Sequence, residues 1–344
     1  MNTEIIRLRS AMNRTIRAFF DSRNYLEVDT PLLSPDLIPE SAIDIFKTRF
    51  ESGHNDAQEF YLIPSPEIWM KKLLSQGSGS IYQICRSFRN REQRGRLHNP
   101  EFTMLEWYET GADYWKSIET TEALFRELAP LSGDSTIKNT WSAPFRRMSM
   151  EEAFREYTGE EISPWCKPGE EGMAALLGSL EKLGHTDYTP QSWEEGFNLI
   201  FVHQVEPSLP QERPLILFDY PANIPTLAAN KKDSPWSERW ELYIGGCELA
   251  NCYTEETAPE KVKEYYGREA PFKTMVKKPG EIHDQKQGPI LHKVDKGYHR
   301  FFHPDFPGTS GVAMGMDRLL MLMGGKANLQ GVILFPFSDI FDRN

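Results

Sequence analysis

The sequence predicts an α+β fold, in which a sheet of several strands is combined with helices. Segments rich in β-branched and aromatic residues have the composition of strands, and they occupy residues 60–63, 81–88, 102–108 and 215–220. The pair Gly245-Gly246 marks the turn of a hairpin that covers residues 240–251. Apolar residues at helical spacing occur at the N-terminus, through a central block and after Gly315.

The N-terminal segment is expected to form an amphipathic helix that begins after Asn2 or Thr3, either of which suits a helix cap. Its apolar residues at helical spacing are Ile5, Leu8, Met12, Ile16 and Phe19. The helix should end near Asn24. Residues 25–31 then have an extended pattern whose proline limits further pairing, so we expect this element at a sheet edge or a subunit boundary.

The central part of the chain, about 115–210, is expected to be a mainly helical insertion into a single domain that covers residues 1–344. Helical patterns occur at residues 117–129, 149–157, 172–184 and 192–205, and a shorter one at 70–75. Residues 257–306 are charged and rich in Gly, Pro and His, so we expect a helix near their start and then a loop. A strand from Gly311 leads into the apolar helix MDRLLMLM.

Composition narrows the class of protein. The formal net charge of -11 offers no wide basic face for gripping a polyanion. The four cysteines lack CxxC spacing and the density of a disulfide scaffold, which favours reduced thiols in a cytosolic protein without structural zinc. No apolar run is long enough to cross a bilayer, and the N-terminus lacks the apolar core of a secretory signal. We therefore expect a cytoplasmic protein without a membrane partner.

The strand at residues 102–108 carries polar side chains on one face. Period-2 alternation places Glu106 and Tyr108 on the same face as Phe102. A carboxylate on an inward face needs a partner, which could be the ammonium group of a ligand. For Glu106 taken alone, an internal ion pair with an arginine is an equal alternative.

The hairpin brings two carboxylates together. With Gly245-Gly246 as a two-residue turn, Tyr243 lies opposite Glu248, so Glu241 and Glu248 share a face roughly 7 Å apart. Two glutamates beside a nucleotide suit Mg²⁺, which water and phosphate oxygens complete, although a solvated hairpin face is the alternative. Strict alternation places Asn251 on the other face from Glu248, so one site could use both residues only if a bulge intervenes.

The segment from Gly311 to Arg318 combines glycines with an arginine in the first turn of a helix. Glycines let the backbone approach a ligand closely, and such an arginine can stack on a purine or meet a phosphate. A surface ion pair of Arg318 is the alternative.

Together these segments resemble the signature of class II aminoacyl-tRNA synthetases. Motif 1 would be the first helix with the strand that ends at Pro31, motif 2 would be residues 88–102, and motif 3 would be residues 311–318. The lysine-type branch is most similar, because Ser65-Pro66-Glu67 and the runs at 98–102 and 248–255 look like that branch. The resemblance covers nearly the whole chain and implies an antiparallel sheet flanked by helices.

Lysyl-tRNA synthetases carry an N-terminal OB-fold domain that reads the anticodon, whereas this chain begins on the motif 1 helix, so we expect no such domain. A catalytic domain of this kind on its own resembles the elongation factor P--(R)-β-lysine ligase family, at SFRN, HNPEFTMLEWY and SGVAxGxDRL. Ala313 stands where lysyl-tRNA synthetases usually have Gly. Its methyl group would reshape the pocket floor for a β-amino acid, although a harmless exchange of Gly for Ala is the alternative.

The resemblance implies ATP-dependent activation of a lysine-like amino acid, expected to be (R)-β-lysine, as aminoacyl-AMP, and transfer to a lysine of elongation factor P. The catalytic residues it implies are Arg89 and Arg318. The ATP-binding residues it implies are Arg89, Glu92, His98, Asn99, Phe102, Glu248, Leu249, Gly315 and Arg318, with Arg91 as the alternative to Glu92. The residues it implies for the amino acid are Ser65, Pro66, Glu67, Tyr108, Asn251, Glu255 and Ala313. The Mg²⁺ ligands it implies are Glu241 and Glu248.

Motif 1 further implies a homodimer, and tRNA is not expected as a partner. Two alternatives to this function stay open. One is a tRNA-charging or free amino acid ligase of the lysyl-tRNA synthetase type. The other is a non-catalytic regulatory paralogue, against which the presence of Arg89, Glu241, Glu248 and Arg318 argues.

Overall fold

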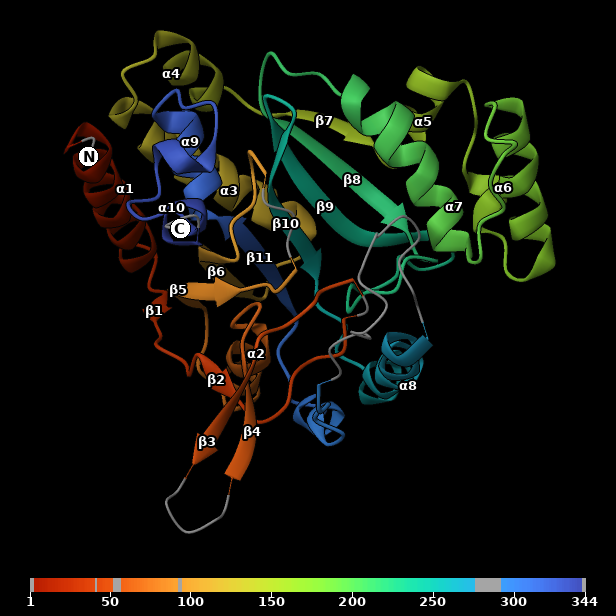
Figure 1. Ribbon diagram of the computed structural model, residues 1–344, viewed down its shortest axis with the longest axis horizontal. Coiled ribbons are helices and arrows are strands. Elements are labelled where there is room, and N and C mark those ends of the chain that lie inside the picture. Colours follow the sequence, from red (N-terminus) through yellow and green to blue (C-terminus); the bar gives the residue numbers. More distant parts are fainter. Residues whose placement is uncertain (1–2, 41, 52–56, 92–94, 276–291, 342–344) are drawn as a thin grey trace.

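A large sheet forms the centre of the molecule (Figure 1). The computed structural model describes residues 3–40, 42–51, 57–91, 95–275 and 292–341. Within these residues, eight strands form one sheet in the order β1-β5-β6-β11-β10-β9-β8-β7. The bounds of the strands are β1 Leu26–Glu27, β5 Ile81–Phe88, β6 Glu101–Thr110, β7 Arg146–Ser149, β8 Leu215–Pro221, β9 Trp236–Ile244, β10 Cys247–Thr254 and β11 Thr309–Gly315.

In this order, the six strands β5, β6, β11, β10, β9 and β8 pair antiparallel with their neighbours. The parallel pairs of this sheet lie at its two edges, between β1 and β5 and between β7 and β8. The expected α+β fold with an antiparallel sheet is confirmed, as is the edge position of residues 25–31. The hairpin turn is confirmed too: Gly245 and Gly246 have φ values of 58° and 71°, the left-handed conformation that a two-residue type I′ turn needs.

Helices flank the sheet. Their bounds are α1 Thr3–Asp21, α2 Glu67–Ser75, α3 Tyr114–Leu128, α4 Ser135–Ser142, α5 Met150–Thr158, α6 Glu170–Lys182, α7 Trp193–Ile200, α8 Pro259–Met275, α9 Met316–Met323 and α10 Phe337–Phe341. The N-terminal helix is confirmed, and it ends at Asp21 rather than near Asn24, which has a left-handed φ of 61°. None of the helices in the described residues has the length and apolar character needed to span a membrane.

One face of the sheet is covered by α1, α3 and α9, which pack together in the main core. Leu105 and Trp107 of β6 and Trp240 of β9 are fully buried on this face. Burying a large apolar side chain contributes roughly 1.5–3 kcal/mol relative to leaving it exposed. This packed face leaves the alternate side chains of the same strands to point the other way, where the candidate site lies.

The helices of residues 115–210 divide between two cores. Trp141 of α4 and Phe125 of α3 belong to the main core, whereas α5, α6 and α7 form a second core with β7 and β8 around Phe154, Trp165 and Phe197. Figure 1 shows α5, α6 and α7 grouped beside β8, away from α1 and α4. The helices themselves are confirmed. That these helices form one insertion in a single domain stays a prediction. Because α3 and α4 pack in the main core, only α5, α6 and α7 form a separately packed group.

Two regions differ from the sequence prediction or extend it. A small sheet, β2 Leu33–Ser34, β3 Lys47–Glu51 and β4 Ala57–Leu62, pairs in the order β2-β4-β3, and only β4 had been predicted. The helix expected near the start of residues 257–306 is confirmed as α8. Of the loop expected after it, residues 276–291 lie outside the described residues.

Candidate active site

A cavity of about 400 Å³ lies over the sheet face that does not pack on α1. Met104, Glu106 and Tyr108 of β6 line it, whereas their neighbours Leu105 and Trp107 are buried in the main core. The face predicted for Glu106 and Tyr108 is therefore confirmed. The residues expected to bind amino acid, nucleotide or metal that line this cavity are Ser65, Glu67, Arg89, Tyr108, Glu241, Asn251, Glu255 and Ala313.

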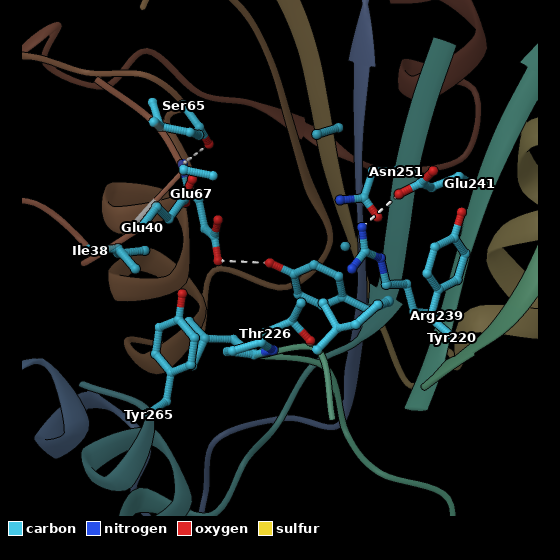
Figure 2. A pocket seen from close by; sticks show the side chains of 18 of the residues that line it. Ile38, Glu40, Ser65, Glu67, Tyr220, Thr226, Arg239, Glu241, Asn251 and Tyr265 are labelled. Atoms are coloured by element: carbon cyan, nitrogen blue, oxygen red, sulfur yellow. Dashed lines mark hydrogen bonds and ion pairs between the residues drawn. The ribbon is translucent and has the colours of Figure 1, made fainter. Parts of the chain in front are cut away.

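A β-bulge brings the two arms of the hairpin into this site. Glu248 pairs with Tyr243, as predicted, but the register shifts between Glu248 and Ala250, so that Asn251 pairs with Glu241. Both Asn251 and Glu241 line the cavity (Figure 2). A bulge was the condition for Glu248 and Asn251 to serve the same site, and the strand has this bulge.

The start of α2 supplies one end of the cavity. Pro66 is the buried N-cap of this helix, and it places Ser65 and Glu67 on either side of the helix start. The Ser65 Oγ accepts a hydrogen bond of 3.1 Å from the Glu67 backbone N–H. The Glu67 Oε1 accepts one of 3.1 Å from the Tyr253 hydroxyl. Figure 2 shows Ser65 and Glu67 across the cavity from Arg239 and Glu241.

A lysine that the sequence analysis missed lies between two of these carboxylates. The Lys71 ammonium is 2.5 Å from Glu67 Oε1 and 2.5 Å from Glu255 Oε2, and the lysine side chain is 0% exposed. Burial lowers the pKa of this lysine, and Glu255 and Glu67 outweigh burial, so its pKa lies above the usual value. The signal in the sequence is the i, i+4 spacing of Glu67 and Lys71 on one helix.

Glu106 is held by hydroxyl groups. The Ser65 hydroxyl donates to its Oε1 at 2.6 Å, and the Tyr108 hydroxyl donates a long bond of 3.4 Å to its Oε2. Burial raises the pKa of Glu106 to about 8, and the hydrogen bond from Ser65 opposes this shift. A buried carboxyl group that keeps its proton near neutral pH is prepared to ionise when a cation enters.

Glu255 follows the end of β10. Burial raises its pKa to about 8, against the opposing influence of Lys71. Its backbone N–H donates to Thr309 O at 2.8 Å. A Cβ atom added at Gly311 would lie 2.5 Å from Glu255 Oε1 and 2.5 Å from the Tyr108 ring, so only glycine leaves room for both side chains here.

Arg89 brings positive charge to the cavity. It follows β5, and its backbone N–H donates to Pro100 O at 2.9 Å. Its guanidinium carbon lies 5.3 Å from the centre of the Phe102 ring. The Arg89 Nε is buried without a hydrogen-bond partner in the described structure. A buried donor of this kind is available for a ligand anion.

Arg318 is fixed in place by three acceptors. Its Nε donates to Leu97 O at 3.1 Å, its Nη1 to Glu248 O at 2.6 Å and its Nη2 to the His98 ring at 3.0 Å. The structure thereby brings together His98, Glu248 and Arg318, three residues expected at the nucleotide. These acceptors are two backbone carbonyls and a histidine ring rather than a surface carboxylate, so the alternative of a surface ion pair for Arg318 is wrong.

Glu241 and Glu248 are the residues that could hold a divalent metal ion. The Glu241 carboxylate accepts hydrogen bonds of 2.6 Å from Arg239 and 2.8 Å from the Tyr243 hydroxyl. Burial and the neighbouring Glu241 charge raise the pKa of Glu248 to about 7, against the opposing influence of Arg318. Two carboxylates that repel each other in this way fit a shared Mg²⁺. No group of three or more acidic, histidine or cysteine residues in the described part of the chain could hold a metal, so phosphate and water would have to complete it.

Arg239 is a second residue that sequence reasoning missed. It lines the cavity, and its guanidinium carbon lies 4.4 Å from the centre of the Tyr220 ring. Its Nε is buried without a hydrogen-bond partner among the described residues. The period-2 spacing of Arg239 and Glu241 on one strand could have revealed it.

The remaining expected residues lie around the cavity rather than in its lining. Leu249 is buried in the main core, and Gly315 is the N-cap of α9. Asn99 and His98 line a second, smaller cavity of about 60 Å³ beside Phe337. Among the described residues, the arginine over the Phe102 ring is Arg89 and not Arg318, so the adenine stacking expected of Phe102 and Arg318 stays a prediction. Glu92 lies outside the described residues, while Arg91 has a left-handed φ of 53°.

Further acidic residues surround the cavity. Glu40, Glu194 of α7 and Glu269 of α8 line it together with the carboxylates described above. Burial and the neighbouring Glu269 raise the pKa of Glu194. The cavity therefore has an acidic side that suits cations and arginines that suit anions.

Comparison with known proteins identifies the family of this chain. Residues 1–339 match the family of class II tRNA synthetases of the D, K and N type. The chain belongs to this family. It is 35% identical over 337 residues to the elongation factor P--(R)-beta-lysine ligase of Vibrio atlanticus (strain LGP32), covering 96% of this chain and 95% of that protein. The same-named protein of Yersinia enterocolitica serotype O:8 / biotype 1B (strain NCTC 13174 / 8081) is 34% identical over 332 residues, which cover 95% of this chain and 93% of the relative.

These similarities extend over almost the full length of both chains, so the chain also belongs to the elongation factor P--(R)-beta-lysine ligase family. The resemblance stated from the motifs is confirmed. Membership of a ligase family indicates an enzyme that forms a bond.

Proposed function

We propose that this protein activates a lysine-like amino acid, expected to be (R)-β-lysine, with ATP and transfers it to a lysine side chain of elongation factor P. The single observation that carries the proposal is the cavity, whose lining includes three carboxylates grouped around Ser65 and Lys71 and also Arg89, which lies near Glu248 and has a buried donor without a partner in the described structure. An amino acid with two ammonium groups and one carboxylate has the matching charges. The names of the relatives support the acceptor.

In the first step, a carboxylate oxygen of the amino acid attacks the α-phosphorus of ATP, and diphosphate leaves. The attacking group is already ionised, so the protein has to orient it and stabilise the charge that develops on the phosphate. We assign the phosphate and carboxylate to Arg89, with Arg318 beside it. His98, Asn99, Phe102, Leu249 and Gly315 are assigned to the nucleotide, and Glu92 stays a prediction for the same role.

Glu241 and Glu248 would hold Mg²⁺, which supplies charge neutralisation on the phosphate oxygens when it is bound. Arg239 and Tyr243 hold the Glu241 carboxylate in place by hydrogen bonds. Their effect is to orient this ligand before the nucleotide arrives, as is usual for residues that contact metal ligands.

At the other end we assign the ammonium groups to Glu67, Glu106 and Glu255, within a wall that includes Ser65, Tyr108, Asn251 and Ala313. Pro66, the N-cap of α2, is assigned to hold Ser65 and Glu67 at this wall. In the second step the ammonium group of the acceptor lysine first loses a proton to solvent, and the neutral amine attacks the acyl carbon. The amide C–N bond forms, the acyl C–O bond to AMP breaks, and AMP leaves while the amide nitrogen gives its second proton to solvent. The acidic side of the cavity, with Glu194 and Glu269, suits the approach of a cationic acceptor side chain.

The test is ATP–diphosphate exchange with a panel of amino acids, followed by transfer to candidate acceptors. We expect exchange to be stimulated more by (R)-β-lysine than by L-lysine, and the label to appear on elongation factor P. Label on tRNA would instead favour the tRNA-charging alternative. ATP binding without exchange for any amino acid would favour the non-catalytic paralogue.

A further inference from the structure

Lys71 is the most deeply buried charge at the acidic end of the cavity. Its side chain is 0% exposed, its ammonium lies 2.5 Å from one oxygen of Glu67 and of Glu255, and it is 5.2 Å from the centre of the Tyr253 ring. A buried ammonium is strongly unfavourable unless it is paired. Two carboxylates are more than one lysine needs for pairing.

The two carboxylates come from distant parts of the chain. Glu67 starts α2, while Glu255 follows the end of β10. Both line the cavity, and Lys71 lies behind them as a fully buried residue. The lysine contacts Glu67 Oε1 and Glu255 Oε2, and this leaves the second oxygen of each carboxylate for other partners. The second oxygen of Glu255 lies over Gly311, which also lines the cavity.

We propose that Lys71 is a built-in counter-ion that positions Glu67 and Glu255 for the ammonium groups of the amino acid and sets how many such groups the cavity accepts. The inference rests on the proposed function. Lys71 is a positioning residue in this scheme, because it acts through the two carboxylates.

Charge balance explains the specificity. Glu67, Glu106 and Glu255 carry three negative charges when all are ionised, and Lys71 cancels one of them, so two remain. Two is the number of ammonium groups on a lysine-like amino acid whose carboxylate binds elsewhere. An amino acid with one ammonium group would leave a buried carboxylate without a partner or with its proton.

The balance depends on pH through groups that face one another from several elements. Cys85 of β5 interacts with the charge of Glu106, and Tyr265 and Tyr266 of α8 interact with that of Glu67. Glu106 and Tyr108 come from β6, Glu67 and Lys71 from α2, and Tyr253 and Glu255 from β10 and its end; Tyr298 faces the same carboxylates from the 3₁₀ turn Tyr298–Phe301. The pKa values of Glu106 and Glu255 are raised to about 8 in the empty cavity. Below this pH both groups tend to hold protons, which the incoming ammonium groups must displace. The KM for the amino acid is therefore expected to fall as pH rises from 6.5 toward about 8.

The experiment compares Lys71→Met with wild type in ATP–diphosphate exchange between pH 6.5 and 9. Lys71 favours the ionised form of Glu255, so removing it is expected to move the fall in KM to higher pH by about one unit. At pH 7.5 this corresponds to roughly a tenfold higher KM for the amino acid. The KM for ATP and the kcat should stay within about threefold of wild type.

Lys72→Met is the matched control. Lys72 is the next residue of the same helix, and its ion pair of 2.7 Å with Asp295 lies outside the cavity lining. This variant should leave the pH profile unchanged. In a Glu255→Gln background, Lys71→Met should no longer shift the profile, since the carboxylate through which the lysine acts is gone.

The proposal would be overturned if the pH dependence of the KM for the amino acid were unchanged in Lys71→Met. It would also be overturned if the KM values for amino acid and ATP rose equally, because a lysine with only a structural role would give either result. If the methionine variant does not fold, Lys71→Gln keeps a hydrogen-bond donor without the charge and is subject to the same criteria. If the wild-type protein showed no ATP–diphosphate exchange with any of the amino acids tested, the proposed function itself would be wrong.

Discussion

The two ends of the cavity hold their charged groups in different ways. At the acidic end, Glu67 and Glu255 share one buried lysine, and the pKa values of Glu106 and Glu255 are raised to about 8. At the arginine end, Arg318 is fixed by two backbone carbonyls and a histidine ring. The carboxylates of the acidic end can thus change their protonation when a ligand binds, whereas hydrogen bonds hold the Arg318 side chain in one orientation.

The difference shows how a cavity can admit a cationic ligand and a polyanionic one together. Carboxylates that take protons in the empty state avoid mutual repulsion and ionise only when ammonium groups arrive. Arg318, which lies outside the cavity lining, is held instead by two backbone oxygens and the His98 ring. Substitutions at each end should therefore affect different kinetic constants.

The largest effect is expected for Glu248→Gln, at the arginine end. Loss of a metal ligand should lower the rate of exchange on the order of 10³-fold. The fold should be unaffected: burial and Glu241 raise the pKa of Glu248 in the folded protein, so its charge opposes folding above the unfolded-state pKa and a neutral amide removes that penalty. Exchange assays with thermal unfolding measure the two effects.

Glu238→Gln is the control for this prediction, because Glu238 is a carboxylate of the paired strand β9 whose side chain alternates to the face opposite Glu241 and does not line the cavity. Substantial exchange by Glu248→Gln at saturating Mg²⁺ would show that the metal is held elsewhere.

A smaller and more selective effect is expected for Gly311→Ala, at the acidic end. The new Cβ would lie 2.5 Å from both Glu255 Oε1 and the Tyr108 ring, and neither can retreat easily because Tyr108 is buried and Glu255 is paired with Lys71. We expect the KM for the amino acid to rise on the order of 10²-fold, as a misplaced contact by about 1 Å can do. The KM for ATP should change little.

Gly308→Ala offers a matched comparison for Gly311→Ala. A Cβ at Gly308 meets nothing within 4 Å, so this variant should behave like wild type. If Gly311→Ala raised the two KM values equally, the two ends of the cavity would not be independent.

Much of this arrangement follows from local sequence patterns. The Gly-Gly turn fixes which residues of β9 and β10 face each other near the turn, and alternation along β6 assigns Glu106 and Tyr108 to the cavity. The bulge between Glu248 and Ala250 could only be stated as a requirement, because a register shift depends on packing against the neighbouring strands. Lys71 was missed because its second partner, Glu255, is far away in the sequence.

Other parts of the fold lacked a local signal. All the side chains of β3 are exposed, and its sequence KTRFE shows no apolar alternation, so nothing marked Lys47–Glu51 as a strand. The helices of the central block were predicted, but their division between two cores depends on contacts between distant residues. Periodicity identifies which face of a helix is buried and does not identify its partner.

The smallest effect is expected for Ala313→Gly, which tests the amino acid preference itself. Ala313 pairs with Glu106 on one side and Asn251 on the other, so its methyl group lies in the cavity floor between the two ends. One methyl group discriminates between substrates by roughly tenfold or somewhat more. We expect the ratio of kcat/KM for (R)-β-lysine to that for L-lysine to fall by about tenfold in exchange assays. Ala250→Gly controls for the general effect of glycine in a strand, because Ala250 pairs with Met314 in the main core. An unchanged ratio in Ala313→Gly would mean that the exchange of Gly for Ala is harmless and that other residues set the preference.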